Sequence, residues 1–124
     1  MKRLILVVED QEDNREILRT LLTNAGYDMI EADNGQAGFD AAASQQPDLI
    51  IMDIQLPVLD GYEATRRIKN DPTLCRIPII VVTSYALSGD ETKARAAGCD
   101  AYITKPYSPR AVLSKVRQFL PTTA

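Results

Sequence analysis

The feature that most restricts the fold is the regular alternation of short apolar runs with amphipathic segments along the chain. An apolar run of about five residues followed by a segment of helical spacing is typical of a βα unit in a parallel sheet. The first, third and fourth runs are continuously apolar, as expected for central strands covered by helices on both faces. The predicted strands are Leu4–Val8, about 27–32, Leu49–Met52, Ile79–Val82 and Ala101–Thr104.

The segments between these runs carry start and stop signals of helices. Apolar residues recur at helical spacing from Ile17 to Ala25, and Gly26 ends this first helix. The other predicted helices run from Asn34-Gly35 to before Pro47, from near Gly61 to Asp71, from about Gly89 to Gly98, and from Ser108-Pro109 to Pro121. The residues therefore predict an α/β fold, a (βα)₅ doubly wound parallel sheet, with the strand order left open. No linker divides the chain, so 1–124 is expected to be a single domain without an output domain.

Composition and charge exclude several functions. The net charge of −3 and pI near 4.9 argue against binding to nucleic acid or anionic lipid, which requires clustered Lys and Arg. The apolar runs are far shorter than the roughly 20 residues that span a bilayer, and no secretion signal is recognised, so a cytoplasmic location is expected. Cys75 and Cys99 are expected to be reduced thiols with a structural role. The absence of His excludes a Ser-His-Asp triad and a His-ligated zinc.

Polar side chains follow four of the five predicted strands. The carboxyl ends of parallel strands meet at one edge of the sheet, where such folds bind their ligands. These side chains are therefore expected to converge on one crevice. They are Glu9 and Asp10 after the first run, Asp53 after the third, Thr83 and Ser84 after the fourth, and Lys105 after the fifth.

This set of groups predicts a phosphoryl site beside a metal ion. Three carboxylates crowded without a cation would repel one another, so the cluster favours a hard divalent ion, with Mg²⁺ the natural candidate. Asp53 is the best nucleophile because its carboxylate, alone at the end of the middle strand, can form an acyl phosphate. Lys105 can neutralise another anionic oxygen, and Thr83 can donate a hydrogen bond to the same group. On this reasoning Asp53→Asn is expected to stabilise the metal-free protein.

Four motifs in order are similar to the response-regulator receiver domain of two-component signalling, over the whole chain. They are Val7-Val8-Glu9-Asp10, Met52-Asp53-Ile54-Gln55-Leu56-Pro57 with Asp60-Gly61, Val82-Thr83-Ser84, and Tyr102-Ile103-Thr104-Lys105-Pro106. The resemblance implies a flavodoxin-like fold with strand order 2-1-3-4-5. It also implies a signalling protein rather than an enzyme, one that assists its own phosphorylation and slow autodephosphorylation.

The resemblance further implies the roles of the site residues. Asp53 would be phosphorylated from a phosphohistidine of a sensor histidine kinase or histidine phosphotransfer protein. Asp10, Asp53 and the main-chain carbonyl of Gln55 would ligate Mg²⁺, with Glu9 acting through water. Lys105 would contact the phosphoryl group, and its peptide bond to Pro106 would be cis.

The resemblance also implies a switch. Thr83 would swing toward the phosphate, and Tyr102 would turn inward and remodel the face formed by the fourth helix, the fifth strand and the fifth helix, which would control a downstream protein target. Gln55 and Tyr85 would tune the lifetime of the acyl phosphate, and Ser84, Tyr85 and Pro106 would be secondary residues of the site. A homodimer formed on phosphorylation is left open. It is also left open whether four apolar residues form a partner surface or belong to the ordinary surface and core. They are Ala86, Leu87, Tyr107 and Val112.

Three other functions fit the sequence less well. An Mg²⁺-dependent phosphohydrolase with an aspartate nucleophile usually needs a second acid two residues later, where this chain has Gln55. A flavodoxin would need a small-residue loop after the first strand to hold the flavin phosphate, and Glu9-Asp10-Gln11-Glu12-Asp13 would repel it. A scaffold that is never phosphorylated would be expected to have lost acceptor, metal or lysine residues, and this chain retains them.

Overall fold

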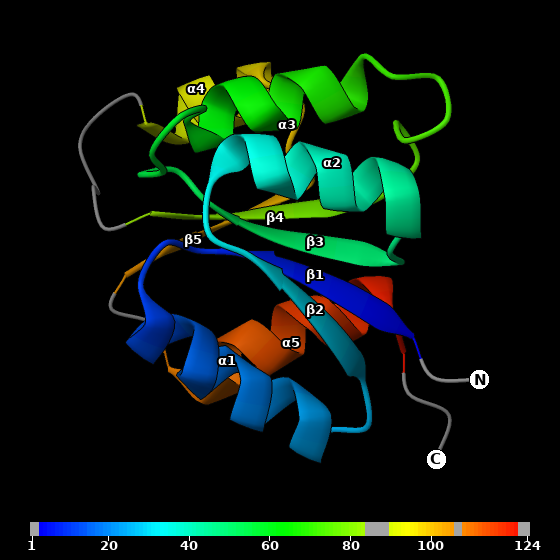
Figure 1. Cartoon of the computed structure of the whole chain (residues 1–124). Helices are drawn as coiled ribbons and strands as arrows, with labels where there is room; N and C mark the ends of the chain where they lie inside the picture. The colour runs from blue at the N-terminus through cyan, green and yellow to red at the C-terminus, as the bar shows by residue number, and fades with distance from the viewer. Residues whose placement is uncertain (1–2, 84–89, 106–107, 122–124) are drawn as a thin grey trace.

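The computed structural model describes residues 3–83, 90–105 and 108–121, which form a parallel sheet with helices between the strands (Figure 1). The sheet has the order β2-β1-β3-β4-β5. This confirms the predicted (βα)₅ doubly wound fold and the order implied by the receiver resemblance. The strands are β1 (Leu4–Val8), β2 (Asp28–Ala32), β3 (Leu49–Asp53), β4 (Ile79–Thr83) and β5 (Ala101–Thr104).

The helices cover both faces of the sheet. Helices α2, α3 and α4 lie on one face, and α1 and α5 lie on the other (Figure 1). Each face has its own apolar core, so a central strand is buried on both sides: Ile51 of β3 packs toward α1 and α5, while Ile50 and Met52 pack toward the other helices. The helices are α1 (Glu12–Asn24), α2 (Gly35–Gln45), α3 (Gly61–Lys69), α4 (Asp90–Ala96) and α5 (Pro109–Phe119).

Side-chain caps fix where three of these helices begin. The side-chain oxygens of Asn34, Asp60 and Ser108 accept hydrogen bonds from main-chain N–H groups in the first turns of α2, α3 and α5, at 2.8, 2.9 and 3.1 Å. Helix α1 lacks such a cap and begins at Glu12, five residues before the first apolar residue of its periodic pattern. Its first turn is acidic, which suits the positive end of a helix dipole.

Tyr27 differs from its predicted place in the second strand, since β2 begins one residue later. Its side chain is buried, and its hydroxyl donates a 2.7 Å hydrogen bond to the main-chain carbonyl of Leu120, beyond the end of α5. This bond ties the start of β2 to the end of the described chain.

Tyr27→Phe is therefore expected to lower the free energy of unfolding by about 1–2 kcal/mol, because the Leu120 carbonyl loses its buried donor. Urea denaturation of the two proteins measures this difference. A loss below about 0.3 kcal/mol would mean that water replaces the hydroxyl without penalty.

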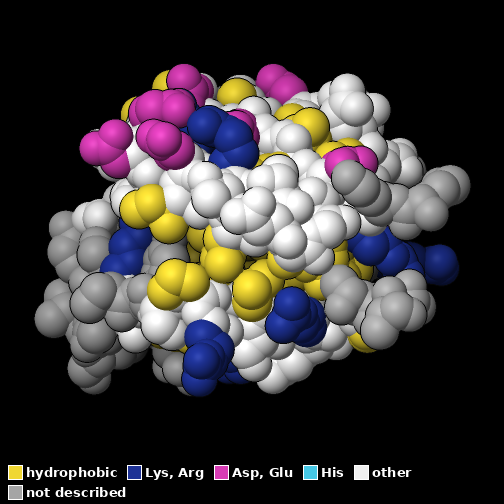
Figure 2. Space-filling view, turned by 90° about the horizontal axis from the view of Figure 1, so that it is seen from below, with side chains coloured by type: hydrophobic (Ala, Val, Ile, Leu, Met, Phe, Trp, Pro, Cys, Tyr) yellow, Lys and Arg dark blue, Asp and Glu magenta, His cyan; other side chains and the backbone are white. Residues whose placement is uncertain are grey.

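The face formed by α1 and α5 carries a shallow groove between the two helices, lined by Leu21, Pro109, Leu113 and Arg117. Figure 2 shows apolar side chains gathered along this face, with most acidic side chains on one flank and basic side chains beside them, at the ends and on the opposite flank. Ile17 of α1, also part of the groove, is 52% exposed. Among the helices described, none is long and apolar enough to cross a membrane.

Candidate functional site

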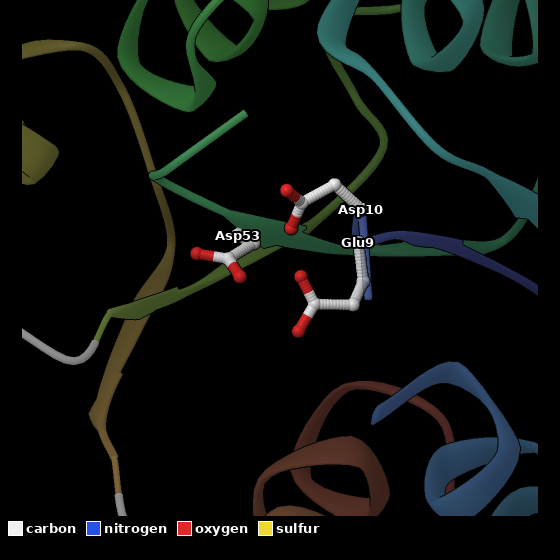
Figure 3. Close-up of side chains that lie close together, drawn as sticks. All are labelled: Glu9, Asp10 and Asp53. Atoms are coloured by element: carbon white, nitrogen blue, oxygen red, sulfur yellow. The ribbon is translucent and has the colours of Figure 1, made fainter. Parts of the chain in front are cut away.

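The carboxyl-terminal edge of the sheet brings together the acidic residues singled out in the sequence. Glu9 follows β1, and Asp53 is the last residue of β3. Figure 3 shows the carboxylates of Glu9, Asp10 and Asp53 close together, with one oxygen of Glu9 turned toward the other two groups. One oxygen from each residue lies within 4.8 Å of the others. Glu9 and Asp53 are buried and Asp10 is exposed, so the cluster opens to solvent on the Asp10 side.

Lys105 connects two of these carboxylates. Its Nζ lies 2.8 Å from Asp53 Oδ2 and 3.1 Å from Glu9 Oε1, and its main-chain N–H donates to the Thr83 carbonyl at 2.6 Å. Lys105 was predicted to lie in this crevice, but its charge, which lies between Glu9 and Asp53, was not counted in the expected repulsion between the carboxylates. The expected stabilisation by Asp53→Asn no longer follows, since that change would also remove an ion pair.

The electrostatics of the cluster depend on burial. Burial raises the pKa of Glu9 to about 7, helped by the neighbouring Asp53 carboxyl and opposed by Lys105. Burial alone would lower the pKa of Lys105, but its hydrogen bonds and charge interactions with Asp53 and Glu9 outweigh this, and the pKa is raised. Lys105 thus stays charged, while Glu9 changes its protonation near neutral pH.

The loop after β3 holds Asp53 from the other side. The main-chain N–H of Gln55 donates to Asp53 Oδ1 at 3.1 Å, and the N–H of Gly61 donates to the Ile54 carbonyl at 2.9 Å. A Cβ atom at Gly61 would lie 2.1 Å from the carbonyl oxygen of Asp53. The start of α3 can therefore approach the end of β3 only because residue 61 is glycine.

Two residues at this site were missed in the sequence. Asn14 Nδ2 donates to Glu9 Oε1 at 2.7 Å, and Arg15 donates to the main-chain carbonyl of Glu9, also at 2.7 Å. Both lie in the first turns of α1, outside the four motifs. The one available signal was their position early in the helix that follows β1, because this places their side chains near the end of that strand.

The structure describes some of the remaining predicted residues and not others. Thr83 is buried at the end of β4, and Tyr102 in β5 is half-buried and packs against the core beneath α2, α3 and α4. Val112 is 1% exposed in the core beneath α1 and α5, so it is not part of a surface available to partners. Six predicted positions lie outside the described residues: Ser84, Tyr85, Ala86, Leu87, Pro106 and Tyr107. Cys75 and Cys99 form no disulfide in the described part of the chain; Cys75 is exposed and Cys99 is buried.

The donor set fits a hard cation. Glu9 Oε2 is buried and has no hydrogen-bond donor among the described residues, a costly state for a carboxylate oxygen. Glu9 belongs to a cluster whose other members, Asp10 and Asp53, also offer oxygen ligands of the kind that Mg²⁺ prefers. A divalent ion held at the cluster, or a water bound to it, would satisfy this oxygen, and the exposed Asp10 leaves the ion open to water.

Comparison with known proteins points to one family. A family model of the response regulator receiver domain matches residues 5–117. The polar-differentiation response regulator DivK of Brucella anthropi is 42% identical over 120 residues, covering 97% of this chain and 98% of that protein. The protein of the same name from Brucella ovis is 41% identical over the same length.

Solved structures agree with this similarity. The receiver domain of the sensor histidine kinase PA1611 from Pseudomonas aeruginosa, solved with a magnesium ion coordinated in its active-site cleft, superposes with a TM-score of 0.90 at 34% identity, covering 98% of this chain and 100% of that one. The chemotaxis protein CheY4 of Vibrio cholerae has a TM-score of 0.90 at 24% identity, covering 96% of this chain and 99% of that one, and supports the fold alone.

Proposed function

Because the chain belongs to the response-regulator receiver family of two-component signalling, we propose that it is a phosphorylation-dependent switch whose phosphoryl acceptor is Asp53. The donor is a phosphohistidine of a sensor histidine kinase or histidine phosphotransfer protein. The observation that carries the proposal is the place of Asp53: a buried carboxylate that ends the central strand, with Lys105 Nζ 2.8 Å from one oxygen and two further carboxylates beside it.

The chemistry follows from these contacts. A carboxylate oxygen of Asp53 attacks phosphorus, the bond from phosphorus to the histidine nitrogen breaks, and an acyl phosphate forms. Lys105 is already beside Asp53, so its ammonium can move to the oxygens of the transferred group and stabilise their charge. Asp53 is only 5% exposed, which limits the access of competing water.

The metal in this proposal is Mg²⁺, held by Asp10, Asp53 and the main-chain carbonyl of Gln55, with Glu9 acting through water. When bound, Mg²⁺ neutralises negative charge on the carboxylates and on the phosphoryl oxygens. The buried Oε2 of Glu9, which accepts no hydrogen bond from the residues that the structure describes, supports this assignment. The magnesium ion in the related PA1611 receiver domain supports it as well.

The output of the switch is a change in packing at the face of α4, β5 and α5. Thr83 ends β4 and pairs with Thr104 of β5. A shift of Thr83 toward a phosphoryl group would therefore displace residues of the neighbouring strand. Tyr102, half-buried on that strand, then moves inward and alters the surface offered to a downstream protein. We propose secondary roles in this switch for Ser84 and Tyr85, which follow Thr83 in the sequence, and for Pro106, which follows Lys105.

Intact-mass spectrometry after incubation with acetyl phosphate tests the acceptor. Wild type is expected to gain one phosphoryl group in Mg²⁺ and none in EDTA, and Asp53→Asn is expected to gain none in either. Asp33→Asn is the matched control, because Asp33 is also a carboxylate that follows a strand but is exposed and outside the cluster. It should behave as wild type.

Two results would contradict the proposal. A phosphoryl gain that survives in Asp53→Asn would place the acceptor elsewhere. A wild-type protein that binds Mg²⁺ but neither gains a phosphoryl group nor binds beryllofluoride would favour a scaffold that works without phosphorylation.

A further inference from the structure

Glu9 is held in place by contacts from several elements. Its main-chain N–H donates to the Ala32 carbonyl at 3.0 Å, and its own carbonyl accepts from Arg15 at 2.7 Å. These two bonds fix the backbone at the end of β1, but they leave the side chain free to rotate. The direction of the carboxylate therefore depends on what its oxygens contact.

The two carboxylate oxygens of Glu9 differ in their partners. Oε1 accepts from both Asn14 Nδ2, at 2.7 Å, and Lys105 Nζ, at 3.1 Å. Oε2 is buried, in a side chain that is only 4% exposed, and it accepts no hydrogen bond from any group in the described part of the chain. Because two donors occupy Oε1, Oε2 is the carboxylate oxygen that remains to interact with a cation site.

The two donors to Oε1 are not equivalent. Lys105 is shared with Asp53, at the shorter distance of 2.8 Å, and its positive charge cancels part of the charge that attracts a metal ion. Asn14 is neutral, so it orients the carboxylate without reducing its charge. It is also carried by α1 rather than by the residue after β5, so its contact with Glu9 does not depend on where the Lys105 side chain points.

We propose that Asn14 is a positioning residue for the metal site, whose side-chain amide holds the Glu9 carboxylate so that Oε2 is left to bind a water of the Mg²⁺ ion. This inference rests on the proposed function in that it takes Mg²⁺ as the bound ion. Groups that orient the residues around a metal in this way typically change its affinity by 10- to 100-fold when removed. Asn14 would act through Glu9 and has no assigned contact with the ion itself.

Isothermal titration with Mg²⁺ tests the proposal. Asn14→Leu keeps the size of the side chain and removes the donor, and we expect it to weaken Mg²⁺ binding by about tenfold. Asn14→Gln keeps an amide on a longer stem and should recover part of that loss. Asn24→Leu, the same change at an exposed position in the last turn of α1, is the matched control and should bind as wild type.

Melting temperatures in EDTA separate positioning from a structural role. If Asn14→Leu melts lower but binds Mg²⁺ as tightly as wild type, the residue is structural and the proposal is overturned. Asn14→Ala, which cannot clash, repeats the test if the leucine variant does not fold. The proposal is also overturned if Asn24→Leu weakens binding as much as Asn14→Leu.

Failure here is distinguishable from failure of the proposed function. A wild type that is phosphorylated in Mg²⁺, beside an Asn14→Leu variant of unchanged affinity, would overturn the role of Asn14 alone. A wild type that binds Mg²⁺ through an Asn14-dependent site but accepts no phosphoryl group would overturn the switch and support the positioning role. If wild type binds no Mg²⁺, both are overturned.

Discussion

Gly61→Ala is expected to lower the free energy of unfolding by about 3 kcal/mol or more, well above a typical surface substitution. A Cβ atom at this position would lie 2.1 Å from the carbonyl oxygen of Asp53 and 2.7 Å from the Cα atom of Ile54. Both are main-chain atoms, so the clash cannot be relieved by turning a side chain. Either α3 must move away from the sheet or the end of β3 must shift.

Urea denaturation measures this effect, and Gly26→Ala is the matched control. Gly26 has a φ of +97°, but outside residues 25–27 no heavy atom lies within 4 Å of the position that an added methyl group would take, so its replacement costs only backbone strain, about 1 kcal/mol. Because Gly61 lies against Asp53, the folded fraction of Gly61→Ala should also accept less phosphoryl group from acetyl phosphate. Equal losses for the two variants would show that the close approach at residue 61 does not matter.

The metal-free protein is expected to lose on the order of 2 kcal/mol of stability as the pH rises from about 5 to 8. Glu9 has a pKa of about 7 in the folded protein, against an ordinary value of 4.5. Between these values the folded state holds a proton that the unfolded state has released. The stabilisation is therefore complete below about pH 4.5 and is lost as the pH rises through 7.

Other shifted groups titrate outside this window. Ion pairs with Arg15 and Arg19 lower the pKa of Glu12 and Glu31, so the stability that these pairs contribute is lost only at more acidic pH. The raised pKa of Lys105 affects stability only at strongly alkaline pH. A decline between pH 5 and 8 therefore reports mainly on Glu9.

Urea denaturation in EDTA at a series of pH values measures this decline. Glu9→Gln, which cannot ionise, is expected to show a nearly flat profile over the same range. Saturating Mg²⁺ should flatten the wild-type profile as well, because the ion stabilises the charged carboxylate. An equal decline in Glu9→Gln would assign the titration to another group.

The sequence was a good guide to the strands and to the edge where the polar groups meet. The three central strands of this parallel sheet are buried and almost continuously apolar, so their runs were visible without knowledge of their neighbours. The strand ends were less certain, because Asp53 and Thr83 are polar and yet complete the ladders of β3 and β4. Hydrogen bonding of the main chain, rather than side-chain polarity, decides where a strand stops.

Contacts between distant residues were harder to predict. The pairing of Lys105 with both Glu9 and Asp53 depends on strand order and side-chain reach, which no local pattern contains. Leu74 is fully buried in a turn between α3 and β4, where no periodic pattern indicates burial. The hydrogen bond from Asn14 to Glu9 likewise depends on how α1 leaves the sheet.

In the proposed metal site, the ammonium shared by Glu9 and Asp53 would also set the valence of the bound ion. With all three carboxylates ionised, three negative charges surround one positive charge, and two more are needed for electroneutrality. A divalent ion supplies both, whereas Na⁺ or K⁺ supplies one and leaves a buried residual charge that is costly in a medium of low polarity. Ordinary salt should therefore screen this cluster without replacing the divalent ion, and discrimination against monovalent ions follows from charge before ionic size is considered.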